Sequence, residues 1–148
     1  MPGVYNVAGV NRMSEQSNTA VVQTVYDAFN AGDLQTVLAN IAPDAEWINH
    51  GPSAVPYFGT FTGRIAEFFG AIGDTVTSGS AAIDQYLASG DTIVARGRWR
   101  ATVRGTGAKI DADIVHFFAI RDGKIMSWNG YGDTAAVLAA HTGKTASA

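Results

Sequence analysis

The segment from Ile110 to Ile120, IDADIVHFFAI, alternates in the way that a β-strand requires. With a period of two, one face of this strand carries apolar side chains and His116, while Asp111 and Asp113 lie on the other face. A histidine on an apolar strand face either hydrogen-bonds a neighbour in a closed core or faces a cavity where it can exchange protons. The segment alone leaves both interpretations open.

The strand expected before it, residues 92–104, alternates just as clearly. Trp99 lies on its apolar face, and Arg98 and Arg100 lie on its polar face. A glycine-rich turn folds the two strands together, so the arginines should lie opposite the two aspartates of the next strand. We expect these charges to form a cross-strand ladder or an oligomer contact rather than a catalytic group.

Helical spacing and strand alternation predict the remaining elements. Helices are expected at 17–31, 33–41, 62–76 and 133–141, further strands at 45–50, 83–88 and 125–132, a loop at 51–61, and a small-residue break at 78–82. Strands joined by tight turns form a curled antiparallel sheet, whose concave face must be covered by three of the helices. The sequence therefore predicts an α+β fold, a cone-shaped sheet with a pocket beneath the helices.

Length and composition fit a single domain. The chain has 148 residues, of which 47% are hydrophobic and 16% are charged, which is enough for one core. We expect this domain to span residues 17–141, with flexible tails at 1–16 and 142–148. The net charge of −3 argues against a nucleic-acid partner, because phosphate binding needs a basic patch.

Several other classes of protein are disfavoured by the composition. The chain contains no cysteine, so it has no disulfide framework and no cysteine nucleophile, which is compatible with a cytoplasmic location. No apolar run approaches the ~18 residues of a membrane span, and the N-terminal segment lacks the features of a signal peptide. Of the other histidines, His50 is out of phase with Asn49 and His141 ends the last helix, so we expect neither a metal site nor a cofactor.

Several large side chains are expected to face the same interior as His116. Strand parity places on inward faces all three tryptophans, one amide and two glycines, namely Trp47, Trp99, Trp128, Asn49, Gly130 and Gly132. A filled aromatic core would explain each tryptophan singly. Their convergence with a histidine, an amide and two glycines that leave room favours a ligand pocket.

Three runs of the sequence resemble a known superfamily. They are AVVQTVYDAFNAGDLQTVLANIAPDAEWINH (residues 20–50), PYFGTFTGRIAEFF (56–69) and VHFFAIRDGKIMSWNGYGDTAA (115–136). Together they are similar to the nuclear transport factor 2-like superfamily, and within it to the SnoaL-like polyketide cyclases and ketosteroid-isomerase-related proteins. The likeness spans about residues 18–140 and implies a cone of curled sheet and helices around a pocket. This fold hosts isomerases, dehydratases, cyclases, epoxide hydrolases and non-enzymatic domains, so the reaction must be argued from the site.

The resemblance also assigns roles to positions in this chain. The general-base aspartate of ketosteroid isomerase corresponds to Asn49, and an amide cannot accept a proton as a carboxylate does. The oxyanion-hole tyrosine falls at or beside Val25, which makes Tyr26 its substitute, and the second oxyanion donor corresponds to His116. SnoaL-like cyclases and scytalone dehydratase are similar in placing a histidine near this point, but the catalytic aspartate of the cyclases corresponds to Gly130.

These observations favour cofactor-free proton transfer on a small hydrophobic, cyclic carbonyl compound, which would be cyclised, isomerised or dehydrated. His116 would act as general acid and base with an ordinary pKa of about 6.5, and Asn49 would donate a hydrogen bond to a developing enolate oxygen. The expected walls of the pocket are Trp47, Trp99, Trp128, Phe118, Tyr26, Tyr57, Phe61, Ile114 and Gly130.

Other functions stay open at this point. A domain that binds a hydrophobic metabolite without chemistry would explain the missing carboxylates, and a structural dimerisation module would fill its interior with the tryptophans. An epoxide hydrolase like limonene epoxide hydrolase would need a relay near Trp99, Gly97 and Gly130, and its residues are absent there.

The outer face of the sheet is also expected to have a function. It carries apolar residues beside the charged ladder, namely Ile48, Val115, Phe117, Ile125 and Tyr131. Such a face is too apolar for solvent, so we expect a homodimer formed through the sheet.

Overall fold

The computed structural model describes the backbone of residues 2–143 and the side chains of residues 13–143. Within this range the helices are α1 (Pro2–Asn30), α2 (Leu34–Ala39), α3 (Ile65–Thr75) and α4 (Thr134–Thr142). The strands are β1 (Ile41–Asn49), β2 (Gly59–Thr60), β3 (Val76–Ser89), β4 (Thr92–Val103), β5 (Lys109–Arg121) and β6 (Lys124–Gly132).

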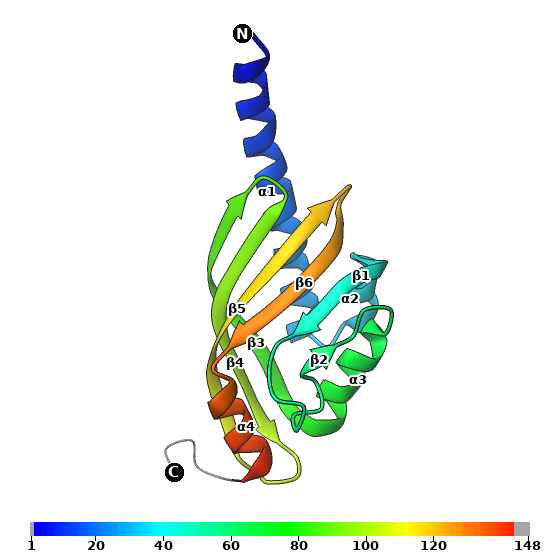
Figure 1. Ribbon diagram of the computed structural model, residues 1–148, viewed down its shortest axis with the longest axis vertical. Coiled ribbons are helices and arrows are strands. Elements are labelled where there is room, and N and C mark those ends of the chain that lie inside the picture. The colour runs from blue at the N-terminus through cyan, green and yellow to red at the C-terminus, as the bar shows by residue number, and fades with distance from the viewer. Residues whose placement is uncertain (1, 144–148) are drawn as a thin grey trace.

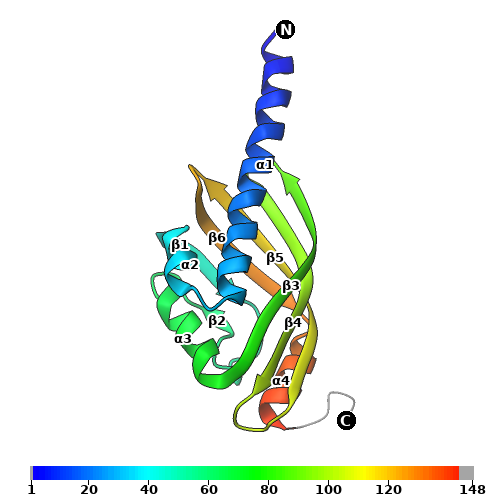
Figure 2. The same cartoon turned by 180° about the vertical axis from the view of Figure 1, so that it is seen from behind.

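All six strands form one sheet, in the order β2-β1-β6-β5-β4-β3. Strands β1 and β6 run parallel, and every other neighbouring pair is antiparallel. The sheet is curled, with α1 crossing one face and α3 lying beside it, while α4 follows β6 at the end of the sheet (Figures 1 and 2). The α+β fold with a mixed, curled sheet and helices on its concave face is therefore confirmed.

Helix α1 is longer than its sequence pattern predicts. It begins at Pro2, so the expected start at residue 17 is wrong, and its first part extends beyond the sheet (Figure 1). It ends before Gly32, whose φ of 77° is the left-handed conformation expected of a glycine cap. At its end, Asn30 exchanges two hydrogen bonds of 2.9 Å with the backbone of Ala81, which fixes α1 against β3. Most of the expected C-terminal tail, residues 144–148, lies outside the described residues.

Strand β3 replaces the break that the small residues 78–82 led us to expect. It starts directly after α3 at Val76 and runs through this segment with two register shifts against β4. Ser78 takes a φ of 53° at the first shift, and at the second Ala82 carbonyl oxygen lies 2.1 Å from where a Cβ on Gly97 would be. These β-bulges curl the sheet, and the second requires glycine at position 97.

Strands β1 and β6 each differ from expectation at one point. Strand β1 begins at Ile41, which the helical pattern assigned to the helix at 33–41, and it continues through Pro43. A proline is tolerated there because β2 pairs with β1 only at its other end, Ile48 and Asn49. In β6, a register shift opposite Ala119 turns Ile125 into the core with no exposed surface, so its expected place on the outer face is wrong.

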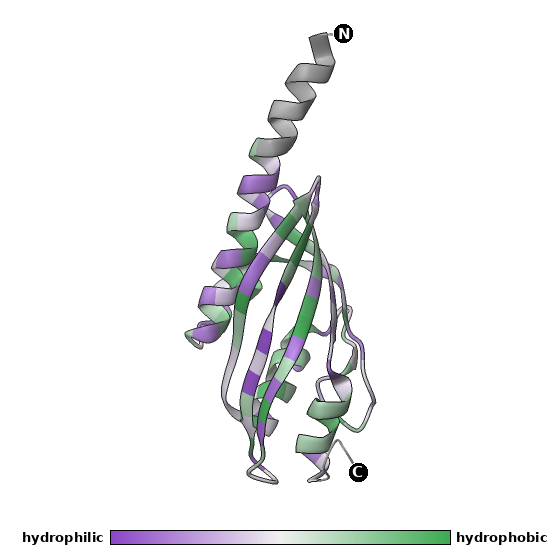
Figure 3. Ribbon diagram, turned by 90° about the vertical axis from the view of Figure 1, so that its left-hand side faces the viewer, coloured by the Kyte–Doolittle hydropathy of each residue, from purple (hydrophilic) through white to green (hydrophobic). Residues whose placement is uncertain are grey.

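The outer face of the sheet carries the expected charged ladder. Arg98 Nε lies 2.5 Å and Arg100 Nε 3.2 Å from Asp111 Oδ1, and Arg98 Nη1 lies 2.8 Å from Asp113 Oδ1. The hydrogen bond from Arg98 holds the pKa of Asp111 below its usual value. Polar and apolar positions alternate along these strands (Figure 3). Asp113 therefore directs its carboxylate outward, away from the helices, as strand parity indicates.

Candidate functional site

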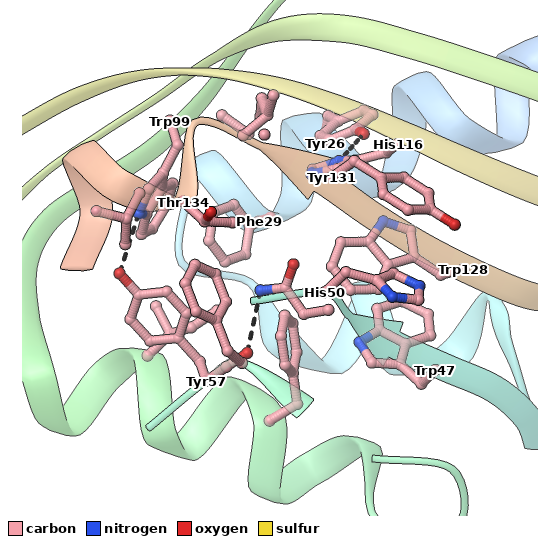
Figure 4. Close-up of a pocket in the computed structure, with 18 of the residues that line it drawn as sticks. Tyr26, Phe29, Trp47, His50, Tyr57, Trp99, His116, Trp128, Tyr131 and Thr134 are labelled. Atoms are coloured by element: carbon pink, nitrogen blue, oxygen red, sulfur yellow. Dashed lines mark hydrogen bonds between the residues drawn. The ribbon is translucent and has the colours of Figure 1, made fainter. Parts of the chain in front are cut away.

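An aromatic pocket lies between the concave face of the sheet and the helices (Figure 4). Helix α1 and helix α3 form one side of it, and strands β1, β4, β5 and β6 form the other. Its lining includes Val25, Tyr26, Phe29, Trp47, Asn49, Tyr57, Phe68, Phe69, Ile72, Trp99, Ile114, His116, Phe118 and Trp128, and also Asp113 and Asp133. Among the described residues no group of three or more His, Asp or Glu side chains is placed to hold a metal ion.

Nine of the eleven residues predicted for the site line this pocket, and two do not. Phe61 lies behind the wall, where its ring packs 5.4 Å from that of Phe68. Gly130 is also covered, because Asn49 Oδ1 and the Trp128 ring each lie 2.6 Å from where its Cβ would be. The glycine thus makes room for two pocket side chains instead of lining the pocket itself.

His116 on β5 is paired with Tyr26 on α1. The phenol oxygen lies 2.5 Å from Nδ1, and the two rings are nearly parallel, with an interplanar angle of 13°. Burial raises the pKa of Tyr26 well above its usual value and lowers the pKa of His116 to about 3. Both groups are therefore uncharged at neutral pH.

The direction of this hydrogen bond decides which tautomer His116 adopts. A buried hydroxyl hydrogen needs an acceptor, and Nδ1 is the partner that the described residues offer to Tyr26. Tyr26 therefore donates to Nδ1, and the imidazole carries its own hydrogen on Nε2. The ring nitrogen left for a ligand is a neutral N–H donor. The expected pKa of about 6.5 for His116, on which its role as general base depended, is wrong because burial lowers it.

Asn49 is held by the loop that follows β1. Its Nδ2 donates to the backbone oxygen of Tyr57 at 3.0 Å, and its Oδ1 lies against Gly130. One of its two N–H groups is thus occupied by the protein, so Asn49 anchors the loop to the strand. Its hydrogen bond to a ligand stays a prediction.

A second tyrosine–histidine pair lies at the α4 end of the pocket. The Tyr57 phenol oxygen lies 2.7 Å from His141 Nε2, and Trp99 Nε1 donates to the same oxygen at 3.2 Å. Burial raises the pKa of Tyr57 to about 12 and lowers the pKa of His141. Sequence reasoning missed His141, because its partner is 84 residues away and no local spacing connects the two.

A third histidine, His50, follows β1 directly and lines the edge of the pocket next to Tyr131, a residue that is 45% exposed and reaches the outer face of the sheet. Its ring stacks on Tyr131 at 4.4 Å and 5°, and its Nε2 lies 2.9 Å from Asn129 Oδ1. Asn129 Nδ2 in turn donates to Glu46 Oε1 at 3.2 Å. Because the amide oxygen accepts, His50 carries its hydrogen on Nε2 and keeps Nδ1 as an unprotonated acceptor when the ring is neutral.

The sequence profile of the SnoaL-like domain matches residues 22–128, which is most of the chain. The protein therefore belongs to the SnoaL-like family, within the nuclear transport factor 2-like superfamily. It has no significant sequence match among curated proteins. The part of the chain that the structure describes contains no helix long and apolar enough to cross a membrane.

Solved structures share this fold over most of their length. A nuclear transport factor 2-like protein of unknown function from Burkholderia pseudomallei is 29% identical, with a TM-score of 0.79 over 85% of this chain and 98% of its own. TerC, co-crystallised with polyporic acid, is 25% identical, with a TM-score of 0.76 over 85% and 98% of the two chains. A protein with a ketosteroid isomerase-like fold from Catenulispora acidiphila is 17% identical, with a TM-score of 0.71 over 86% and 95%, which shows the shared fold alone.

Proposed function

We propose that this protein binds a small, largely apolar carbonyl compound in the aromatic pocket and catalyses its rearrangement by proton transfer, as an isomerisation, cyclisation or dehydration. The observation that carries the proposal is the Tyr26–His116 pair, which leaves one uncharged N–H donor in an apolar cavity. TerC, which shares the fold, was crystallised with polyporic acid, and this supports an organic ligand for the pocket. We also propose that the protein acts in the cytoplasm.

His116 is assigned the role of oxyanion donor. When a C–H bond next to the carbonyl is broken, negative charge develops on the carbonyl oxygen, and the Nε2–H group of His116 stabilises it there. Tyr26 is a positioning residue, because its hydrogen bond to Nδ1 fixes both the ring and its tautomer. The surrounding aromatic rings exclude water, which strengthens this interaction.

The proton acceptor is assigned to His50. Its Nδ1 has no hydrogen-bond partner among the residues whose side chains the structure describes, while its Nε2–H donates to Asn129, which in turn donates to Glu46. The chain Glu46–Asn129–His50 orients the imidazole in the way that a carboxylate orients a catalytic histidine, and it stabilises the charge that the ring gains with the proton. The proton then returns to a different carbon, or leaves with a hydroxyl group as water.

Binding without chemistry is the second candidate function. The family resemblance implies a catalytic aspartate at two positions, but this chain has Asn49 at one and Gly130 at the other. The lack of these two carboxylates favours binding without chemistry. The two functions differ in whether a bound ketone exchanges its α-hydrogens with solvent.

The test is deuterium exchange into cyclic ketones such as 1-tetralone, followed by mass spectrometry in heavy water. We expect the wild-type protein to accelerate exchange, and His116→Phe to reduce the acceleration by roughly 10²–10³-fold, as for the loss of one oxyanion donor. His50→Gln should lower it as well, whereas Phe61→Leu, which alters a ring behind the pocket wall, should not. Ketones that bind without any accelerated exchange would establish the binding function instead.

We further propose that the protein forms a homodimer through the outer face of the sheet. Phe117 and Tyr131 are 43% and 45% exposed there, with ring centroids 5.9 Å apart, beside the ladder of Arg98 and Asp111. Light scattering coupled to gel filtration should give twice the monomer mass for the wild type. Phe117→Lys should give the monomer mass, because it buries a charge in the interface; a monomeric wild type would contradict the proposal.

A further inference from the structure

Trp47 lies in the wall of the pocket with an unused hydrogen-bond donor. Its side chain is 2% exposed, and its Nε1 has no hydrogen-bond partner among the residues whose side chains the structure describes. Buried indole N–H groups are normally paired. Trp99 in the same pocket follows this rule, since its Nε1 donates to Tyr57 at 3.2 Å. Trp47 therefore differs from its neighbour in a way that needs a physical reason.

The rings packed against Trp47 offer it no acceptor. Phe68 and Phe69 lie 5.8 and 5.9 Å away between ring centroids, and Trp128 stacks on Trp47 at 4.8 Å and 22°. The phenylalanine rings have no polar atom, and the indole of Trp128 is itself a donor. A buried water needs two to four polar partners, so these rings make a poor site for one. Because Trp47 lines the pocket, a molecule bound there can supply the missing acceptor.

Trp128 contacts both the Trp47 ring and the His116 ring, which carry the two N–H donors. The ring centroid of His116 lies 4.8 Å from that of Trp128, which is the same distance as that of Trp47. Figure 4 shows Trp128 between these two residues. The two donors therefore belong to rings that both contact Trp128, and a flat ligand that reaches both would need one acceptor oxygen for each.

We propose that Trp47 Nε1–H is a second oxygen-binding subsite, and that the natural ligand is a flat ring compound with two acceptor oxygens. One oxygen binds His116 and the other binds Trp47, so the class comprises diketones, hydroxy ketones and quinones of one to three fused rings. A ligand with an amine at this point would place donor against donor, and the pocket rejects it. The inference rests on the proposed function, because it takes His116 as the first donor.

The test compares two bicyclic probes, 1-tetralone with one carbonyl oxygen and 2-methyl-1,4-naphthoquinone with two. The chain has no cysteine, so the quinone has no thiol to react with. We expect the wild type to bind the quinone about tenfold more tightly than 1-tetralone, the gain of about one good hydrogen bond. Trp47→Phe should reduce this preference to within about twofold, while Phe61→Leu, which changes a ring behind the pocket wall and keeps the donor, should retain it. Calorimetry measures both affinities.

A second readout does not depend on any variant being stable. In nitrogen-15-labelled wild-type protein, the Nε1–H resonance of Trp47 should move downfield when the quinone binds and stay nearly unchanged with naphthalene. A preference that survives Trp47→Phe, or a resonance that the bound quinone leaves in place, would overturn the subsite. Binding of 1-tetralone with no quinone preference would refute this inference alone, whereas failure of both probes to bind would refute the proposed function as well.

Discussion

The molecule contains two tyrosine–histidine pairs that share their chemistry and differ in their surroundings. Tyr26 and His116 connect α1 to β5 with nearly parallel rings, and the phenol oxygen has one hydrogen-bond partner among the described residues. Tyr57 and His141 connect the loop after β1 to α4 with rings at 71°, and the phenol oxygen also accepts from Trp99. The same two side chains therefore leave a neutral N–H group of His116 in the pocket at one place and receive a further donor, Trp99, at the other.

Burial accounts for this difference. His116 is surrounded by Tyr26, Phe118 and Trp128, and its pKa falls to about 3, so it stays a neutral donor throughout the physiological range. His141 lies near the end of the last helix, where desolvation lowers its pKa to a smaller extent. A tyrosine partner fixes the tautomer of a histidine, and the depth of the site decides whether that histidine can also charge.

The two pairs should differ most in how strongly their histidines, His116 and His141, make the free energy of unfolding depend on pH. His116 has a folded pKa of about 3, below an unfolded value of about 6.5. The unfolded chain therefore takes up the proton first, so the stability from neutral His116 is complete above pH 6.5 and is lost as the pH falls toward 3. Between pH 6 and 4 the wild type should lose about 1.4 kcal/mol per pH unit more than His116→Phe.

Urea unfolding at pH 7, 6, 5 and 4 measures this difference directly. His141→Phe is the matched control, and its stability curve should stay closer to that of the wild type because the pKa of His141 is lowered less. Curves for the wild type and His116→Phe that run parallel would mean that His116 charges freely in the folded protein, and the contrast between the pairs would be lost.

A smaller effect is expected when the second pair is broken. Tyr57→Phe removes the acceptor of Trp99 Nε1, which would leave a buried donor unpaired and should lower the free energy of unfolding by about 1–3 kcal/mol. The rate of α-deuterium exchange should stay within about fivefold of the wild type, because Tyr57 does not orient His116. Tyr26→Phe should instead reduce the exchange rate more than it reduces stability. If Tyr57→Phe slowed exchange as much as His116→Phe, both pairs would belong to the reaction.

The inward face of the site could be predicted from the sequence because strand alternation is a local property. Side chains on β5 alternate without a shift through His116 and Phe118, so parity gave their direction correctly. Parity failed for Ile125, where a register shift between β5 and β6 turns the side chain into the core. It also could not reveal the first half of β3, because the glycine, serine and alanine residues at 78–82 resemble a loop until β4 provides a partner for them, whereas the strand expected at 83–88 is part of β3.

The electrostatic state of the site depends on contacts between distant segments. Tyr26 and His116 are 90 residues apart in the sequence. The packing of α1 across the sheet brings them together and shields the imidazole from solvent. The sequence identified both residues as members of the pocket, but it assigned His116 an ordinary pKa because nothing local indicates its burial. The unpaired nitrogen of Trp47 is likewise visible only after Phe68, Phe69 and Trp128 have been placed around it.

The crowding around Gly130 limits which residue position 130 can carry. A Cβ at that position would lie 2.6 Å from both Asn49 Oδ1 and the Trp128 ring. A single substitution cannot place here the aspartate that resemblance to the cyclases implies, because the amide and the indole already fill its volume. An engineered Gly130→Asp variant therefore needs a second change, at Asn49 or at Trp128, and either change removes part of the present pocket.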